Sequence, residues 1–106
     1  MRELMALPEP PTALFLANAR ASIACVPALR DLGVAGLSLI GFGDFPMADA
    51  LDPALTVIDQ NPAKLGGLAI ARVLDRIDHP GRRFRRGNVE PVRLIERASC
   101  RRVGQD

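Results

Sequence analysis

Two short apolar runs on either side of a glycine-containing loop constrain this fold more than any other feature. The first run, Leu37–Ile40, ends at Gly41-Phe42-Gly43-Asp44, and the second, Leu55–Ile58, follows Asp52-Pro53. Such short runs, bounded by glycine or proline, indicate buried strands rather than helices. Ligands of open α/β sheets bind where the strands end. We therefore expect a binding site beside Gly43 and Asp44.

Strand and helix signals alternate along the rest of the chain. The sequence predicts strands over 12–17, 37–42, 55–59 and 92–95, and helices over 19–32 and 62–78. Asn18 can cap the first helix and Gly33 can end it, while Asn61-Pro62 is typical of the start of the second. Pro27 lies inside the first helix, where proline costs about 3 kcal/mol unless the helix bends. The alternation predicts an α/β fold, a parallel sheet flanked by helices.

The helix predicted over 62–78 is amphipathic. Its apolar face comprises Leu65, Leu68, Ala69, Ile70, Val73, Leu74 and Ile77. Arg72, Asp75 and Arg76 are expected to point outward.

Composition excludes several classes of protein. The 106 residues suffice for one domain, and a net charge of +2 is too small to indicate nucleic-acid binding. An arginine cluster at positions 82, 83, 85 and 86 is a candidate contact for nucleic acid, although arginines in a turn are more often solvated. The N-terminus does not resemble a secretory signal, and no run approaches the roughly 20 apolar residues of a membrane span. We expect a cytoplasmic protein that does not contact a membrane.

Catalysis and metal binding are not expected either. His79 is the only histidine, and Cys25 and Cys100 belong to no recognisable motif. No nucleophile elbow, phosphate-binding loop or paired carboxylates stand out, so no enzyme and no cofactor are predicted. Gly41 and Gly43 do not form a dinucleotide-binding loop, because Pro46 stands where a third glycine would be needed. Both are interpreted as turn glycines.

Several segments together resemble the C-terminal part of the effector-binding domain of LacI/GalR-type transcriptional repressors. They are Pro11–Asn18, Gly41–Asp44, Asp52–Val57, Leu65-Gly66 and Leu94–Ser99. They cover roughly residues 10 to 100 in the order and near the spacing of that family. The Gly-Phe-Gly-Asp form is most similar to the gluconate-operon repressors.

The resemblance implies a partial periplasmic-binding-protein-like (type I) fold. The chain would hold the second lobe and the helix that crosses the hinge near Gln60. Residues 1–11 would be a lead-in, 12–100 the partial effector-binding domain and 101–106 a tail. The helix-turn-helix and the first lobe would be missing, so a fragment is expected whose uncovered helix face and sheet edge favour poor solubility or self-association.

The resemblance also implies site residues. Asn18, Phe42, Gly43, Asp44 and Gln60 would bind a small sugar or sugar acid. Three of them have alternative roles: Asn18 as a simple N-cap, Asp44 as an acceptor for turn N–H groups, and Gln60 as an exposed hinge residue. Many sugar-sensing members carry an Asp at the position of Gly43, and its absence favours an anionic effector such as gluconate.

Partners follow from the same resemblance. Ile23 and Leu51 would contact the second subunit of a homodimer, and operator DNA would be bound only through the missing helix-turn-helix. Three other interpretations stay open: a stand-alone binding or dimerisation module, a non-functional gene fragment, and a small α/β enzyme, against which the missing catalytic motifs argue.

Overall fold

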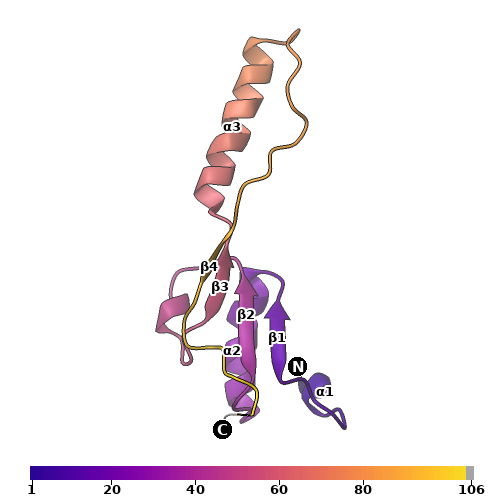
Figure 1. Cartoon of the computed structure of the whole chain (residues 1–106), viewed down its shortest axis with the longest axis vertical. Coiled ribbons are helices and arrows are strands. Elements are labelled where there is room, and N and C mark those ends of the chain that lie inside the picture. The colour runs from indigo at the N-terminus through magenta and orange to yellow at the C-terminus, as the bar shows by residue number, and fades with distance from the viewer. Residues whose placement is uncertain (105–106) are drawn as a thin grey trace. The chain divides into compact units, whose positions relative to one another are not determined.

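Four strands form one sheet in the computed structural model, which describes residues 1–104. In the order β1-β2-β3-β4 they are Ala13–Leu16, Ser38–Phe42, Thr56–Asp59 and Arg93–Ile95 (Figure 1). Strands β1, β2 and β3 are parallel, as predicted. The prediction is wrong for β4, which runs antiparallel to β3, with Arg93 opposite Asp59. The chain leaves the sheet after Asp59 and re-enters at the same edge, and this return reverses its direction.

The contacts divide the chain into two compact units. The first comprises Met1–Asp59 and the described residues from Arg93 onward, and the second comprises Gln60–Val92. The boundary falls at Gln60, where the hinge crossing is predicted. Residues 105–106 of the predicted tail lie outside the described residues.

Helix α2, Ala19–Asp31, contacts β1 and β2 in the first unit. Asn18 caps it, because its Oδ1 accepts a hydrogen bond from Ala21 N–H at 2.8 Å. Gly33, with φ of +65°, ends it as predicted. The helix continues through Pro27, which is exposed. Ile23, whose carbonyl loses its usual donor, is also exposed, so water can satisfy that group.

The core of the first unit lies between α2 and the sheet. It comprises Leu16, Cys25, Val26, Leu29, Leu39, Leu55 and Val57. Gly41 lies inside β2, at the contact between α2 and the sheet, and not in a turn. A Cβ atom there would lie 2.6 Å from Ser22 Oγ of α2. The interpretation of Gly41 as a turn glycine is therefore wrong, and its role is to permit close helix–strand packing.

The segment Arg97–Arg101, here called the strap, follows β4 and bridges the starts of β2 and β3. Ser99 Oγ donates to Leu39 O at 2.6 Å and accepts from Thr56 N–H at 2.8 Å. Leu39 N–H in turn donates to Ser99 O at 2.8 Å. Ser99 is 2% exposed, so these bonds lie in the interior.

The second unit consists of helix α3, Pro62–Asp78, and the segment that follows it. Asn61 Oδ1 accepts from Lys64 N–H at 3.2 Å and Pro62 begins the helix, as predicted. Lys64 Nζ and Glu90 Oε2 lie 2.6 Å apart and join the helix to the returning segment. Within the described chain, no helix combines the length and apolar character that a membrane span needs.

The apolar face of α3 is uncovered, as predicted: no residue of the helix is buried. Ile70, Val73, Leu74 and Ile77 are between 53% and 66% exposed and form what we call the open stripe. Arg72 does not point outward as predicted. It donates to Arg85 O and lies over the Phe84 ring, 5.5 Å from its centroid.

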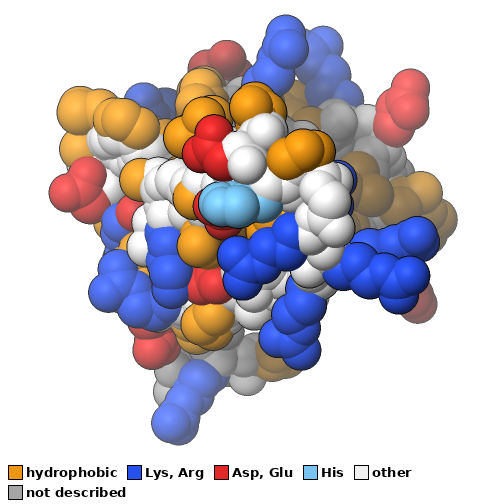
Figure 2. Space-filling model, turned by 90° about the horizontal axis from the view of Figure 1, so that it is seen from above, with side chains coloured by type: hydrophobic (Ala, Val, Ile, Leu, Met, Phe, Trp, Pro, Cys, Tyr) orange, Lys and Arg blue, Asp and Glu red, His pale blue; other side chains and the backbone are white. Residues whose placement is uncertain are grey.

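The predicted arginine cluster contains this aromatic ring. Arg82 also lies over Phe84, with its guanidinium carbon 5.6 Å from the ring centroid. Figure 2 shows the basic side chains of the viewed face in several separate groups, with other atoms between them. The single histidine, His79, ends α3.

The N-terminal lead-in contains one element that the sequence did not predict. Helix α1, Arg2–Met5, has four residues, none of them buried.

Candidate functional site

Strands β1, β2 and β3 are parallel, so their C-terminal ends lie at the same edge of the sheet (Figure 1). The predicted effector residues occupy these ends. Phe42 is the last residue of β2, Gly43 and Asp44 follow it, and Asn18 follows β1. Gln60 comes directly after β3 and is the first residue of the second unit.

Asn18 has a free hydrogen-bond donor besides its capping role. Its Oδ1 is used by the cap, whereas its Nδ2 has no hydrogen bond to any of the residues 1–104. The side chain is exposed. The two roles weighed for Asn18 are therefore compatible, since they use different atoms of one amide.

The backbone conformation at position 43 favours glycine. Its φ is +91°, a conformation that residues with a Cβ rarely adopt, and its N–H donates to Ile58 O at 2.8 Å. This turn explains the glycine without reference to the charge of a ligand. Gly43 is thus weak support for an anionic effector. Phe42 beside it is half-buried.

Asp44 is held by Arg97. Arg97 Nη1 donates to Asp44 Oδ1 at 3.0 Å and Nη2 donates to Oδ2 at 3.1 Å, while Nη1 also donates to Leu55 O at 2.9 Å. The predicted bond to the turn backbone exists too, from Phe45 N–H at 3.0 Å. The hydrogen bond from Arg97 is the largest cause that lowers the pKa of Asp44 below its ordinary value. The pair joins the loop after β2 to the strap.

No local sequence motif marks Arg97 as a site residue. The two partners are 53 positions apart. Only the return of β4 beside β3 brings them together. The one sequence signal for Arg97 is its position inside Leu94–Ser99, one of the segments that carry the family resemblance.

Gln60 has an unsatisfied polar atom. Its Oε1 is the buried side-chain oxygen for which the described residues offer no hydrogen-bond partner. A buried acceptor without a donor costs about 1–3 kcal/mol. A ligand hydroxyl or another chain would remove this cost.

The predicted dimer contacts differ in exposure. Ile23 on α2 is 54% exposed, whereas Leu51 is half-buried and packs against the core. Met47, in the same loop as Leu51, is 68% exposed and was not predicted.

The cysteines and carboxylates form no further site. Cys25 and Cys100 are free thiols, and burial raises the pKa of Cys25. Within residues 1–104, no three His, Cys, Asp or Glu side chains come together as metal ligands.

A family model described as the periplasmic binding protein-like domain matches residues 1–100. The chain belongs to this family. Among curated relatives of this periplasmic binding protein-like domain, the ribose operon repressor of Escherichia coli K12 is 34% identical over 103 residues, which are 94% of this chain and 31% of the relative. The HTH-type transcriptional repressor PurR of Haemophilus influenzae PittEE is 30% identical over 104 residues, 92% of this chain and 31% of the relative. The chain thus spans about a third of the length of these curated relatives.

Solved structures agree with the family. A transcriptional regulator LacI from Bacillus cereus subsp. cytotoxis matches the domain with a TM-score of 0.88 at 24% identity, over 94% of this chain and 36% of that one, which shows the fold. A LacI family regulator from Enterococcus faecalis V583, solved with bound ribose, matches with a TM-score of 0.82 at 28% identity, over 92% of this chain and 37% of that one. The predicted fold class, a partial periplasmic-binding-protein-like fold, is confirmed.

Proposed function

We propose that this domain is part of a cytoplasmic LacI-type regulator and binds a small sugar or sugar acid that controls it. One observation carries the proposal: three parallel strands end at one edge, and each is followed by a predicted effector residue. Ligands of open α/β sheets bind at such edges. The curated relatives are named as repressors, and one structural neighbour contains ribose.

Each of these residues would make a different contact with the ligand. Asn18 Nδ2 would donate to a ligand hydroxyl and Gln60 Oε1 would accept from one, since each of these atoms lacks a partner among residues 1–104. Phe42 would contact the apolar face of the ligand, and Gly43 would leave room for it. Asp44 would border the ligand while its carboxylate, held by Arg97, keeps the loop in place.

Two effectors deserve direct comparison. Gluconate is favoured by the absence of a carboxylate side chain at Gly43, and ribose by the ribose-bound neighbour. The backbone explanation for Gly43 makes ribose at least as strong a candidate.

The regulatory step we propose is closure about the hinge near Gln60. An effector changes that equilibrium only by its different affinity for the open and closed states. Dimerisation through Ile23 and Leu51 would link two such domains. Operator DNA would be bound by a helix-turn-helix outside these 106 residues.

An amide-specific titration tests the proposal. We would titrate the isotopically labelled chain with ribose and with gluconate, and follow the side-chain NH₂ signals of Asn18 and Gln60 by NMR. At least one sugar should shift both. Asn18→Asp retains the capping oxygen but loses the amide donor, so it should keep the melting temperature and weaken binding by about tenfold. Asn18→Ala removes the capping oxygen as well as the amide donor, so it should lower the melting temperature and also weaken binding.

The outcome that contradicts the proposal is clear. If neither sugar moves these signals in a chain whose other resonances are those of the folded sheet, this edge of the sheet is not a sugar site.

A further inference from the structure

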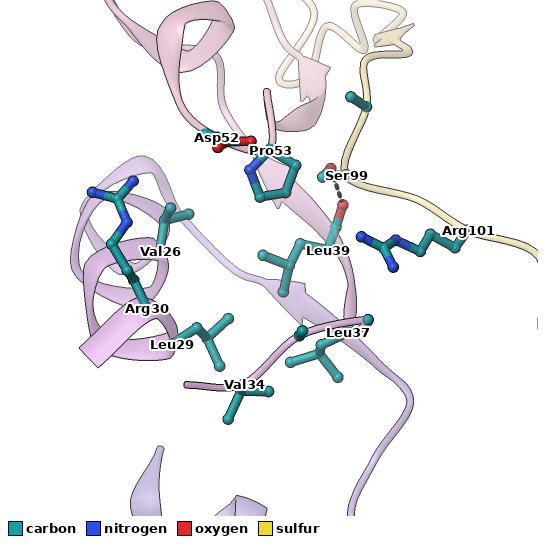
Figure 3. A pocket seen from close by; sticks show the side chains of 13 residues that line it. Val26, Leu29, Arg30, Val34, Leu37, Leu39, Asp52, Pro53, Ser99 and Arg101 are labelled. Carbon is teal, nitrogen blue, oxygen red and sulfur yellow. Dashed lines mark hydrogen bonds between the residues drawn. The ribbon is translucent and has the colours of Figure 1, made fainter. Parts of the chain in front are cut away.

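A cavity of about 270 Å³ lies in the first unit (Figure 3). It is formed by the second half of α2, the link 34–37, the start of β2, Asp52-Pro53 and the strap. These segments meet at the N-terminal ends of β2 and β3. Asn18, Phe42, Gly43 and Asp44 belong to the C-terminal ends, and neither they nor Gln60 line the cavity. It is therefore a separate candidate site.

The inner wall of the cavity is apolar. Val26 and Leu29 of α2 and Leu39 of β2 line it (Figure 3), and these residues are 4%, 6% and 3% exposed. Ser99 lines it as well, but its hydroxyl already bonds to Leu39 O and Thr56 N–H. This wall can therefore contact hydrocarbon but offers little hydrogen bonding.

Two guanidinium groups flank this wall. Arg30 comes from α2 and Arg101 from the strap, on different sides of the cavity (Figure 3). Neither guanidinium has an ion pair or hydrogen bond to the described residues. Asp52 is the single carboxylate on the lining, and it has no ion pair with the described residues either. Two positive charges and one negative charge leave the lining with a net charge of +1.

We propose that this cavity binds a small organic monocarboxylate with a short apolar body. The carboxylate would bind the guanidinium of Arg30 or Arg101, whose planar donor pairs suit a carboxylate. The apolar body would lie against Val26, Leu29 and Leu39. Asp52 repels a second negative charge, so a monoanion is favoured over a dicarboxylate or a phosphate.

Binding there acts on the strap. Arg101 and Ser99 line the cavity, and Arg97 of the same five-residue segment holds Asp44 in the loop after β2. A ligand that binds only the folded chain stabilises it by mass action, so the site can be detected through thermal stability.

The probe we would use is 3-methylbutanoate, with 3-methylbutan-1-ol as a neutral molecule of the same carbon skeleton. Binding to the 106-residue chain would be measured by NMR titration and by the shift in melting temperature. We expect saturable binding of the acid, a rise in melting temperature, and at least tenfold weaker binding of the alcohol. Signals of residues that line the cavity should shift, while the Asn18 side-chain amide should not.

Variants locate the site. At least one of the variants Arg30→Gln and Arg101→Gln should weaken 3-methylbutanoate binding at least fivefold, and the double variant should abolish it. Arg20→Gln is the matched control, because Arg20 is also an exposed arginine of α2 but does not line the cavity. Ala35→Phe places a large side chain at an exposed lining position and should block binding without touching the core.

Two results would overturn the proposal. One is equal binding of the acid and the alcohol. The other is unchanged affinity in either the double arginine variant or Ala35→Phe.

Discussion

Asp44 and Arg97 form a two-point ion pair within the first unit. Their side chains are 29% and 17% exposed, so water screens the pair less than a surface ion pair. Each carboxylate oxygen accepts one guanidinium hydrogen bond. These two side chains therefore connect the loop of the proposed effector site to the strap.

The ion pair predicts how stability depends on pH. The folded-state pKa of Asp44 lies below its unfolded value near 3.8. Stabilisation is therefore fully present above that value and is lost as the pH falls through the folded-state pKa. Asp44→Asn should lower the free energy of unfolding at pH 7 by about 2 kcal/mol and flatten the loss of stability below pH 4. Urea titrations at several pH values measure both. An unchanged acid limb in the variant would show that Asp44 does not contribute.

Ser99 allows a second prediction at this scale. Ser99→Ala removes the acceptor of Thr56 N–H and the hydroxyl donor to Leu39 O, both in the interior. We expect a loss of about 2 kcal/mol in the free energy of unfolding. Ser38→Ala is the control, since its hydroxyl bonds to the strap at an exposed position and should cost less than about 1 kcal/mol. Chemical denaturation checks the difference, and equal losses would contradict the role given to Ser99.

At the scale of the elements, α2 and β2 approach each other at Gly41. The helix buries Ser22, Cys25, Val26 and Leu29, a spacing of three and four residues that defines one face. Ser22 is fully buried, and its Oγ lies only 2.6 Å from the position that a Cβ on Gly41 would take. The distance between helix and strand is therefore set by the absence of one carbon atom.

A double-mutant cycle tests this contact. Gly41→Ala should destabilise the chain by about 1–3 kcal/mol, because the new Cβ would lie 2.6 Å from Ser22 Oγ and 3.2 Å from Leu55 Cδ2. Combining it with Ser22→Ala removes the nearest atom and should recover part of the loss. Gly66→Ala is the control, since nothing lies within 4 Å of its added Cβ. Additive losses in the double variant would show that Ser22 is not the obstacle.

At the scale of the whole molecule, much apolar surface has no partner. The open stripe of α3 is more than half exposed, and β1 is an outer strand of the sheet that carries Phe15 at 59% exposure. Apolar surfaces and strand edges of this kind favour association with another chain.

We expect concentration-dependent self-association of the 106-residue chain through the open stripe. Leu74→Gln with Ile77→Gln should shift sedimentation towards the monomer, because it removes apolar area without changing the net charge. Asp75→Asn, a substitution at the neighbouring polar position, should leave association unchanged. A wild-type chain that sediments as a monomer at all concentrations would contradict this prediction.

The sequence determined which elements form. Short apolar runs specified β1, β2 and β3, and local side-chain chemistry specified the helix ends at Asn18, Gly33 and Asn61-Pro62, because capping depends on residues only a few positions apart. The strand ends and the apolar face of α3 followed from the same local signals, whereas the choice of the proposed effector residues at those ends came from the family resemblance.

The tertiary structure decided what depends on contacts between distant residues. The antiparallel return of β4 places Arg97 beside Asp44 and Ser99 between β2 and β3, and no local signal encodes either contact. The helix-packing role of Gly41, the inward turn of Arg72 towards Phe84 and the cavity between Arg30 and Arg101 arise in the same way. Interactions between residues close in sequence determine whether a segment forms a helix or a strand. The contacts of a side chain are determined only when the packed elements bring remote segments together.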